Sequence, residues 1–142
     1  SACYRAYQAW GVAMQFVTLQ EARDHLRIDG SADDAWLTLM IQAVSQAVVL
    51  WLKEAWRAYE LETDSTGQIV TDSNGDPVPQ WDSNGPIVKP TVKAAVLVEL
   101  ASLYRFREGE GAQHVQPHWG HGYSLSAVAI ALLTPLRRST VV

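Results

Sequence analysis

The chain has 142 residues, 48% hydrophobic and 18% charged, with a formal net charge of −4 at pH 7. This length predicts one domain with its own core. The net negative charge argues against a protein whose main function is to bind nucleic-acid phosphates. The single cysteine, Cys3, excludes an internal disulfide and favours a reducing compartment. We find no signal-peptide pattern and no apolar run of about 18 residues, so we predict no membrane partner.

The N-terminal part divides into an extension and a first helix. Residues 1–16 show weak periodicity and no helix cap, so we assign them to an N-terminal extension. At Thr18 the run Thr-Leu-Gln-Glu forms a capping box, in which the hydroxyl of Thr18 and the carboxylate of Glu21 satisfy each other's backbone N–H groups. We expect this helix to end within 27–30, with Gly30 supplying the positive φ of the stop.

One long helix is predicted over residues 32–59. Ser31 and two acids open it, no Pro or Gly interrupts it, and apolar residues recur at three- and four-residue steps. Trp36, Val49 and Trp56 lie partly off the main apolar stripe. A helix that is apolar on more than one face either lies centrally in its domain or also contacts a partner. Both alternatives, ordinary core and partner contact, stay open from the pattern alone.

Residues 61–90 change character and predict an inserted β-hairpin or meander. An Asp-Ser-x-Gly turn signal occurs three times, at 64–67, 72–75 and 82–85. Short β-prone runs alternate with these turns, and prolines keep the strands short or at an edge. The run 72–76 also resembles the start of a calcium loop, but Ser83 stands where the bidentate acid is expected, so we favour plain turns.

The C-terminal third predicts two helices and a tail. Pro90 opens a helix over 91–108, and the glycines that follow end it. The Gly-rich loop 109–123 contains His114, His118 and His121, which bind either a metal or a partner or are simply solvated. Ser124 or Ser126 caps a short helix over 127–133, and Pro135 is expected to stop it. An extended, β-prone tail then begins at Leu136.

No catalytic motif emerges, so we predict a protein that is not an enzyme. The chain has no nucleophile elbow, no phosphate loop, no dinucleotide glycine pattern and no His-Glu-x-x-His. The helix–turn–helix of residues 18–59 suggests DNA recognition as an alternative. Asp33 and Asp34 stand at the N-terminus of its second helix, however, and would meet phosphates with the wrong sign.

Taken together, these elements resemble the head–tail connector (adaptor, or head-completion) proteins of long-tailed double-stranded DNA phages. The resemblance rests on Val-Thr-Leu-Gln-Glu-Ala-Arg-Asp-His-Leu-Arg-Ile-Asp at 17–29, Asp-Asp-Ala-Trp-Leu at 33–37, Ile-Gln-Ala at 41–43, the helix at 90–108 and the segment 127–137. They occur in the order found in the family and cover most of 17–138. The chain departs from the family at Ser126, where Pro is frequent, and at Leu136, where an aromatic residue is common.

The resemblance implies a mainly α fold: a small helical bundle built on one long helix, with the β-rich insertion at 61–90 and an extended tail. The helical connector domain spans 17–138 and the tail 139–142. It also implies a virion neck protein without cofactors, assembled in the host cytoplasm. Such a protein forms a homo-oligomeric ring, expected to be a dodecamer, between the portal protein and the next neck or tail-completion protein. The ring would extend the channel through which genomic double-stranded DNA passes without sequence-specific binding.

The resemblance and the apolar pattern together give three candidate surfaces. The ring interface is predicted at Trp36, Val49, Trp51 and Trp56. The portal-docking tail comprises Leu136, Arg137, Arg138, Ser139, Thr140, Val141 and Val142, which could add as a strand to a portal edge. The tail-side loop presents Ile69, Val70, Val78, Trp81 and Ile87, and could add a strand in the same way. A small helical DNA-binding regulatory protein remains the alternative.

Overall fold

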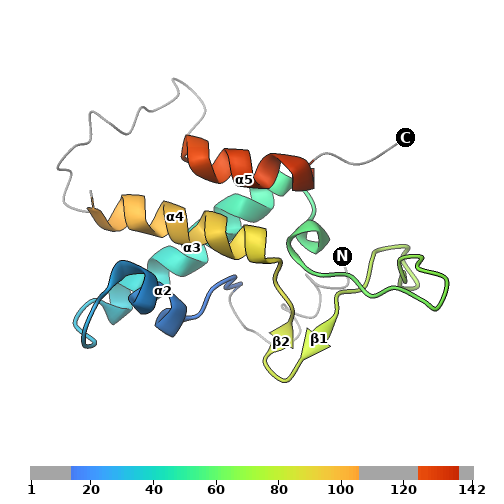
Figure 1. Cartoon of the computed structure of the whole chain (residues 1–142), viewed down its shortest axis with the longest axis horizontal. Coiled ribbons are helices and arrows are strands. Elements are labelled where there is room, and N and C mark those ends of the chain that lie inside the picture. The colour runs from blue at the N-terminus through green and yellow to red at the C-terminus, as the bar shows by residue number, and fades with distance from the viewer. Residues whose placement is uncertain (1–13, 106–124, 138–142) are drawn as a thin grey trace.

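The structure is a computed structural model that describes residues 14–105 and 125–137 (Figure 1). The predicted mainly α fold with a small β insertion is confirmed. In chain order the elements are α2 (Leu19–Leu26), α3 (Asp34–Leu52), the 3₁₀ turn η1 (Ala55–Ala58), β1 (Trp81–Asp82), β2 (Gly85–Pro86), α4 (Pro90–Arg105) and α5 (Ala127–Arg137).

Four helices of the described residues form the bundle. In Figure 1, α4 runs between α5 and α2, and α3 passes behind them. The core lies where the apolar stripes of these helices meet, because burying those side chains is the main favourable term in folding. Its fully buried members are Phe16, Ala22, Leu37, Ile41, Val44, Val48, Leu52, Ala58, Tyr59, Val92, Ala95, Val96, Leu100, Ala129 and Leu133.

Helix α2 begins as predicted but ends earlier. The capping box is confirmed: Glu21 N–H donates to the Thr18 hydroxyl at 3.0 Å, and Thr18 N–H donates to the Glu21 carboxylate at 3.0 Å. Gly30 takes a positive φ of 89° as expected, but it does not stop the helix, because Arg27 takes the left-handed conformation first, with φ 57°. The N–H groups of Arg27 and Ile28 donate back to Asp24 O and Arg23 O, which is the Schellman pattern.

The capping box predicts a measurable pH effect. Burial alone would raise the pKa of Glu21, but bonds from the Thr18 N–H and from the Lys93 ammonium, at 3.0 Å, hold that pKa below its ordinary value. Because the folded pKa is the lower one, the stabilisation is present above the ordinary glutamate pKa and is lost as the pH falls through the folded value. We expect Glu21→Gln to lower the melting temperature near neutral pH, and we expect its difference from wild type to shrink at strongly acidic pH, where Glu21 is protonated in both the folded and the unfolded protein.

Thermal unfolding of both proteins at the two pH values measures this effect. Glu54→Gln is the matched control, because Glu54 is exposed and forms no ion pair within residues 14–105 and 125–137. A Glu21→Gln protein with the same pH profile as the control would contradict the prediction.

Helix α3 is shorter than the predicted helix over 32–59. It starts at Asp34 behind Asp33, which makes no side-chain cap bond, and it ends at Leu52. Lys53 then takes φ 73°, and the chain turns through η1. No Gly or Pro marks this break in the sequence. At this end the Arg57 guanidinium donates to Leu52 O at 2.8 Å, which satisfies a carbonyl left open by the helix.

Helix α3 also passes the length and hydropathy criteria for a membrane span, contrary to the expectation that no such stretch exists. Residues 35–52 carry no charge. In the structure Leu37, Ile41, Val44, Val48 and Leu52 of this helix are buried in the core of the bundle. The core helix of a bundle can meet the same criteria, and these five buried residues account for one apolar face of α3.

The insertion forms an arm, residues 59–88, that leaves the bundle beside η1 and returns into α4 (Figure 1). The predicted antiparallel hairpin is present as β1 and β2, where Trp81 pairs with Pro86. Four isolated antiparallel bridges join the remaining segments, from Tyr59–Val88 at the base to Thr71–Pro77. Each predicted turn is also present, because Asp64, Asp72 and Asp82 each accept from the N–H two residues on.

Backbone hydrogen bonds close the arm into two rings. In each ring three segments of the chain donate and accept in a circle, so that every N–H involved has a partner inside the arm. In the first ring the Glu60 N–H donates to Ile87 O, the Ile87 N–H to Gln80 O and the Gln80 N–H to Glu60 O, each at 2.8 Å. In the second ring the Glu62 N–H donates to Val78 O, the Val78 N–H to Val70 O and the Val70 N–H to Glu62 O, at 2.9–3.0 Å. A partner strand would have to displace these bonds, so strand addition at these positions is disfavoured.

Helix α5 continues through the predicted stop. Pro135 lies inside it, and the helix extends to Arg137. Pro135 cannot donate to the carbonyl of Ala131, but both residues are exposed, so water can satisfy that group. Leu136 and Arg137 are therefore helical and not part of an extended tail.

Two polar contacts dock α5 on the bundle. At its start, Ser126 N–H donates to the buried Glu99 carboxylate at 2.9 Å, and the Ser126 hydroxyl accepts from Ala129 N–H, as predicted for a cap. At its end, Arg57 donates to Arg137 O at 2.7 Å, and the Arg137 guanidinium lies 4.7 Å from the Trp51 ring centre.

Candidate interaction surfaces

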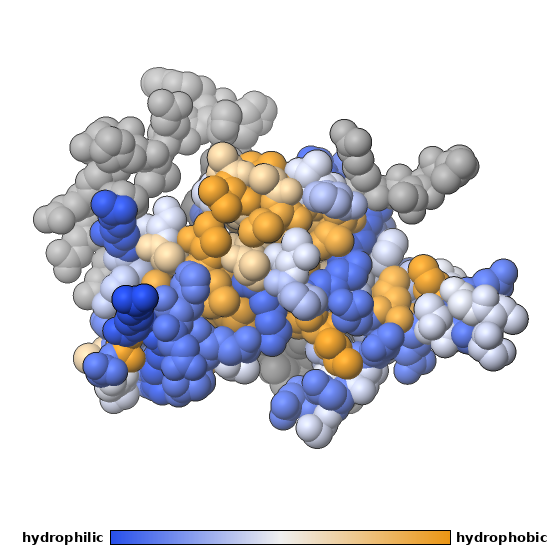
Figure 2. Space-filling view, in the orientation of Figure 1, coloured by the Kyte–Doolittle hydropathy of each residue, from blue (hydrophilic) through white to orange (hydrophobic). Residues whose placement is uncertain are grey.

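Exposed apolar side chains mark candidate contact surfaces, because burying such groups in a complex is favourable. The large hydrophobic side chains exposed among the described residues are Leu39 and Leu50 of α3, Ile69 and Trp81 of the arm, and Val128 of α5. Figure 2 shows apolar side chains gathered over α5 and the neighbouring part of the bundle, while polar side chains cover the region of α2.

The exposed residues of α3 form one face, which we call the outer face: Ala35, Leu39, Ala43, Gln46 and Leu50. Their spacing of three and four residues places them on one side of the helix. Leu39 is 59% exposed and Leu50 80%. No member is charged, so the outer face is an apolar surface at the edge of the domain, on the helix that also supplies much of the core.

The four residues predicted for the ring interface are less available. Trp36, Val49, Trp51 and Trp56 are each partly buried and packed against the core. The Trp36 ring meets the Tyr104 ring edge-on at 5.6 Å, and Arg57 lies 5.4 Å from the Trp56 ring centre. Contacts within the subunit are enough to explain why large apolar side chains occupy these positions. Their role in a subunit interface therefore stays a prediction.

Sequence reasoning missed Leu39 and Leu50. The signal was present: 35, 39, 43, 46 and 50 form a second helical stripe beside the buried one. The prediction favoured Trp36, Trp51 and Trp56 instead, because tryptophan is enriched at interfaces. Tryptophan is also a large side chain that fills much of a core.

The arm presents two of its five predicted contact residues. Ile69 is 51% exposed and Trp81 40%, whereas Val70, Val78 and Ile87 are half-buried. The turns that carry the exposed pair are held by their aspartates. At the first turn the Thr66 hydroxyl, 2.6 Å from the Asp64 carboxylate, holds the pKa of that group below its ordinary value.

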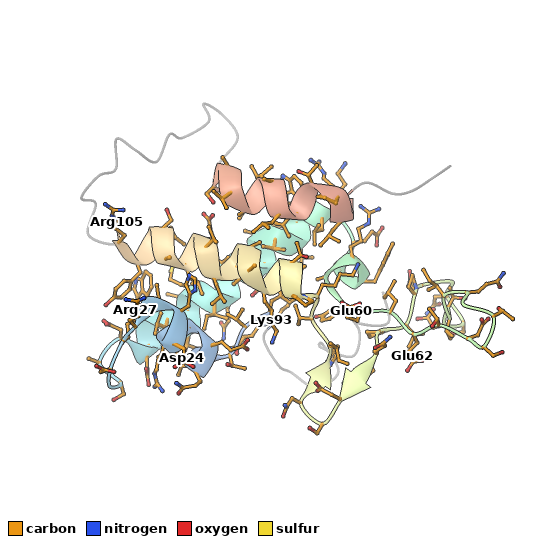
Figure 3. All side chains as sticks on the ribbon, in the orientation of Figure 1. Asp24, Arg27, Glu60, Glu62, Lys93 and Arg105 are labelled. Atoms are coloured by element: carbon orange, nitrogen blue, oxygen red, sulfur yellow. The ribbon has the colours of Figure 1, made fainter. Side chains whose placement is uncertain are left out.

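Charge separates the arm from the rest of the chain. The arm contains six of the 15 acidic residues and none of the 11 basic ones: Glu60, Glu62, Asp64, Asp72, Asp76 and Asp82. Nine acidic and 11 basic residues remain elsewhere, so the rest of the chain has a net charge of +2. In Figure 3, Glu60 and Glu62 lie on the arm side, and Arg27 and Arg105 lie at the opposite end of the molecule.

Comparison with known proteins identifies the family. The family described as "Phage gp6-like head-tail connector protein" matches residues 16–117, which is more than two thirds of the chain. The chain belongs to the gp6-like head–tail connector family. No curated protein and no solved structure matches it.

The connector family is a structural family of the phage virion, and membership supports a structural connector role for this protein. The matched segment contains α2, α3, the arm and α4. The bundle, the outer face and the acidic arm are therefore parts of a connector subunit, and the predicted resemblance is confirmed.

Other predicted sites of this connector lie partly outside the described residues. His114, His118 and His121 lie in the undescribed segment 106–124, and Arg138, Ser139, Thr140, Val141 and Val142 follow the last described residue. Within residues 14–105 and 125–137, no group of three His, Cys, Asp or Glu side chains is placed to hold a metal ion.

The structure also bears on the DNA-reading alternative. Asp34, at the start of α3, forms an ion pair with Arg23, and Asp33 accepts from the Tyr104 hydroxyl at 3.0 Å. The start of this helix is thus acidic and tied to α2 and α4. A recognition helix would need basic or amide side chains free at that end.

Proposed function

We propose that this connector forms a ring adaptor between the portal of the DNA-filled head and the tail, extending the DNA channel and completing the head. The observation that carries the proposal is the outer face of α3 in a member of the connector family. An uncharged face with two exposed leucines on the central helix is suited to contact between identical subunits. We expect the ring to be a dodecamer, assembled in the host cytoplasm.

The two ends of the ring have different partners in this proposal. The segment that follows α5, residues 138–142, docks on the portal, whereas Leu136 and Arg137 belong to α5. The arm lies on the side of the ring that faces the next neck or tail-completion protein. The acidic side chains of the chain would let genomic DNA pass without sticking, because like charges reduce phosphate binding.

Mass measurement by light scattering tests the adaptor function. The chain is run alone and mixed with isolated portal rings, and we expect co-elution at the mass of a portal carrying a ring of 15.7 kDa subunits. A chain that stays monomeric and ignores the portal would contradict the proposal. In that case a duplex titration at two salt concentrations would test DNA binding, whose affinity falls steeply with salt.

A further inference from the structure

We propose that the arm of one subunit packs on the outer face of α3 of the next subunit, so that identical copies join head to tail. The inference rests on the proposed ring and names the contact that builds it. The two surfaces carry four of the five exposed large hydrophobic side chains among the described residues: Leu39, Leu50, Ile69 and Trp81. A contact between two different surfaces of one chain is heterologous, which is the kind that closes rings.

The arm is built as a preformed ligand. Its two closed rings of backbone hydrogen bonds and its three aspartate turns fix the backbone before any partner arrives. Docking a preorganised segment avoids most of the ordering cost of binding. The base of the arm is anchored as well, because Tyr59 is buried in the core and pairs with Val88.

The six acidic residues of the arm restrict which surface of a second copy it can pack against. Two arms placed against each other would bring six acids against six, without one basic residue in either, and like charges across an interface are costly. The outer face has no charged residue, and Lys53, exposed three residues beyond Leu50, forms no ion pair with a described residue. The outer face of a second copy is therefore an apolar surface that the acidic arm can approach without repulsion.

Two variants and their mixture test the contact. Ile69→Glu/Trp81→Glu disables the arm, and Leu39→Glu/Leu50→Glu disables the outer face; all four side chains are exposed, so both variants should fold, which circular dichroism checks. We expect the wild-type chain to form a ring, alone or on isolated portal rings, and each variant to fall to single-chain mass. Mixing the variants should restore one intact contact and give a dimer with one copy of each.

A control and three contrary outcomes complete the test. Val128→Glu, on the exposed part of α5, is the matched control and should leave the assembly unchanged. An arm variant that still assembles like wild type would overturn the proposed contact, and so would a mixture that stays monomeric. Failure of the wild-type chain to bind the portal would overturn the adaptor function itself, so the two failures are distinguishable.

Discussion

Replacing Tyr59 by Ala is expected to lower the free energy of unfolding by about 3–5 kcal/mol, the range for removing a buried large aromatic side chain. Tyr59 is fully buried, and its ring meets the Phe16 ring edge-on with centroids 5.8 Å apart. Its backbone also pairs with Val88 at the base of the arm. The substitution therefore opens a cavity where the segment before α2, the turn after α3 and the arm meet.

Urea denaturation followed by circular dichroism measures this change. Domains of this kind have a total stability of about 5–15 kcal/mol, so this loss is a large share of the total and should shift the urea midpoint clearly. Trp81→Ala is the matched control: it removes a larger aromatic side chain from the same arm, but one that is 40% exposed, and its effect should be well below that of Tyr59→Ala. Equal losses in the two variants would show that the arm is not anchored through Tyr59.

Local signals in the sequence predicted the helices and most of their starts. The capping box at Thr18, the first-turn Pro90 and the cap at Ser126 each act within a few residues of the helix they open. The helix ends were predicted less well. Arg27 and Lys53 take left-handed conformations that sequence rules assign to Gly, and Pro135 does not end α5 because the carbonyl it leaves open lies on an exposed face.

The arm also contains features that local sequence signals do not predict. Its three turns follow from a repeated tetrapeptide, but the two backbone rings depend on residues that lie 7–27 positions apart along the chain. Such long-range pairings have no local signature. The candidate surfaces have the same difficulty, since Trp36 and Leu39 look equally suited to an interface until the structure packs one against Tyr104 and leaves the other exposed.

Deleting residues 138–142 is expected to abolish portal docking while leaving the subunit folded and able to contact its neighbours. Under the proposed function these residues form the part of the docking tail that follows α5. The cut should come after Arg137 and not before it, because Arg137 O accepts from Arg57 and its guanidinium lies on the Trp51 ring. Removing Arg137 as well would confuse loss of docking with loss of the α5 contacts.

Two measurements separate these effects. Co-elution with isolated portal rings should disappear in the truncated chain, whereas its thermal unfolding should match that of the full chain. Arg137→Ala in the full-length chain is the matched control: it removes the cation–π contact with Trp51, an interaction that contributes about 0.5–2 kcal/mol in proteins, but it keeps the tail and should therefore keep portal binding. If the truncated chain still bound the portal at full strength, the contact would have to lie on the bundle or the arm, and the exposed part of α5 around Val128 would be the first surface to test.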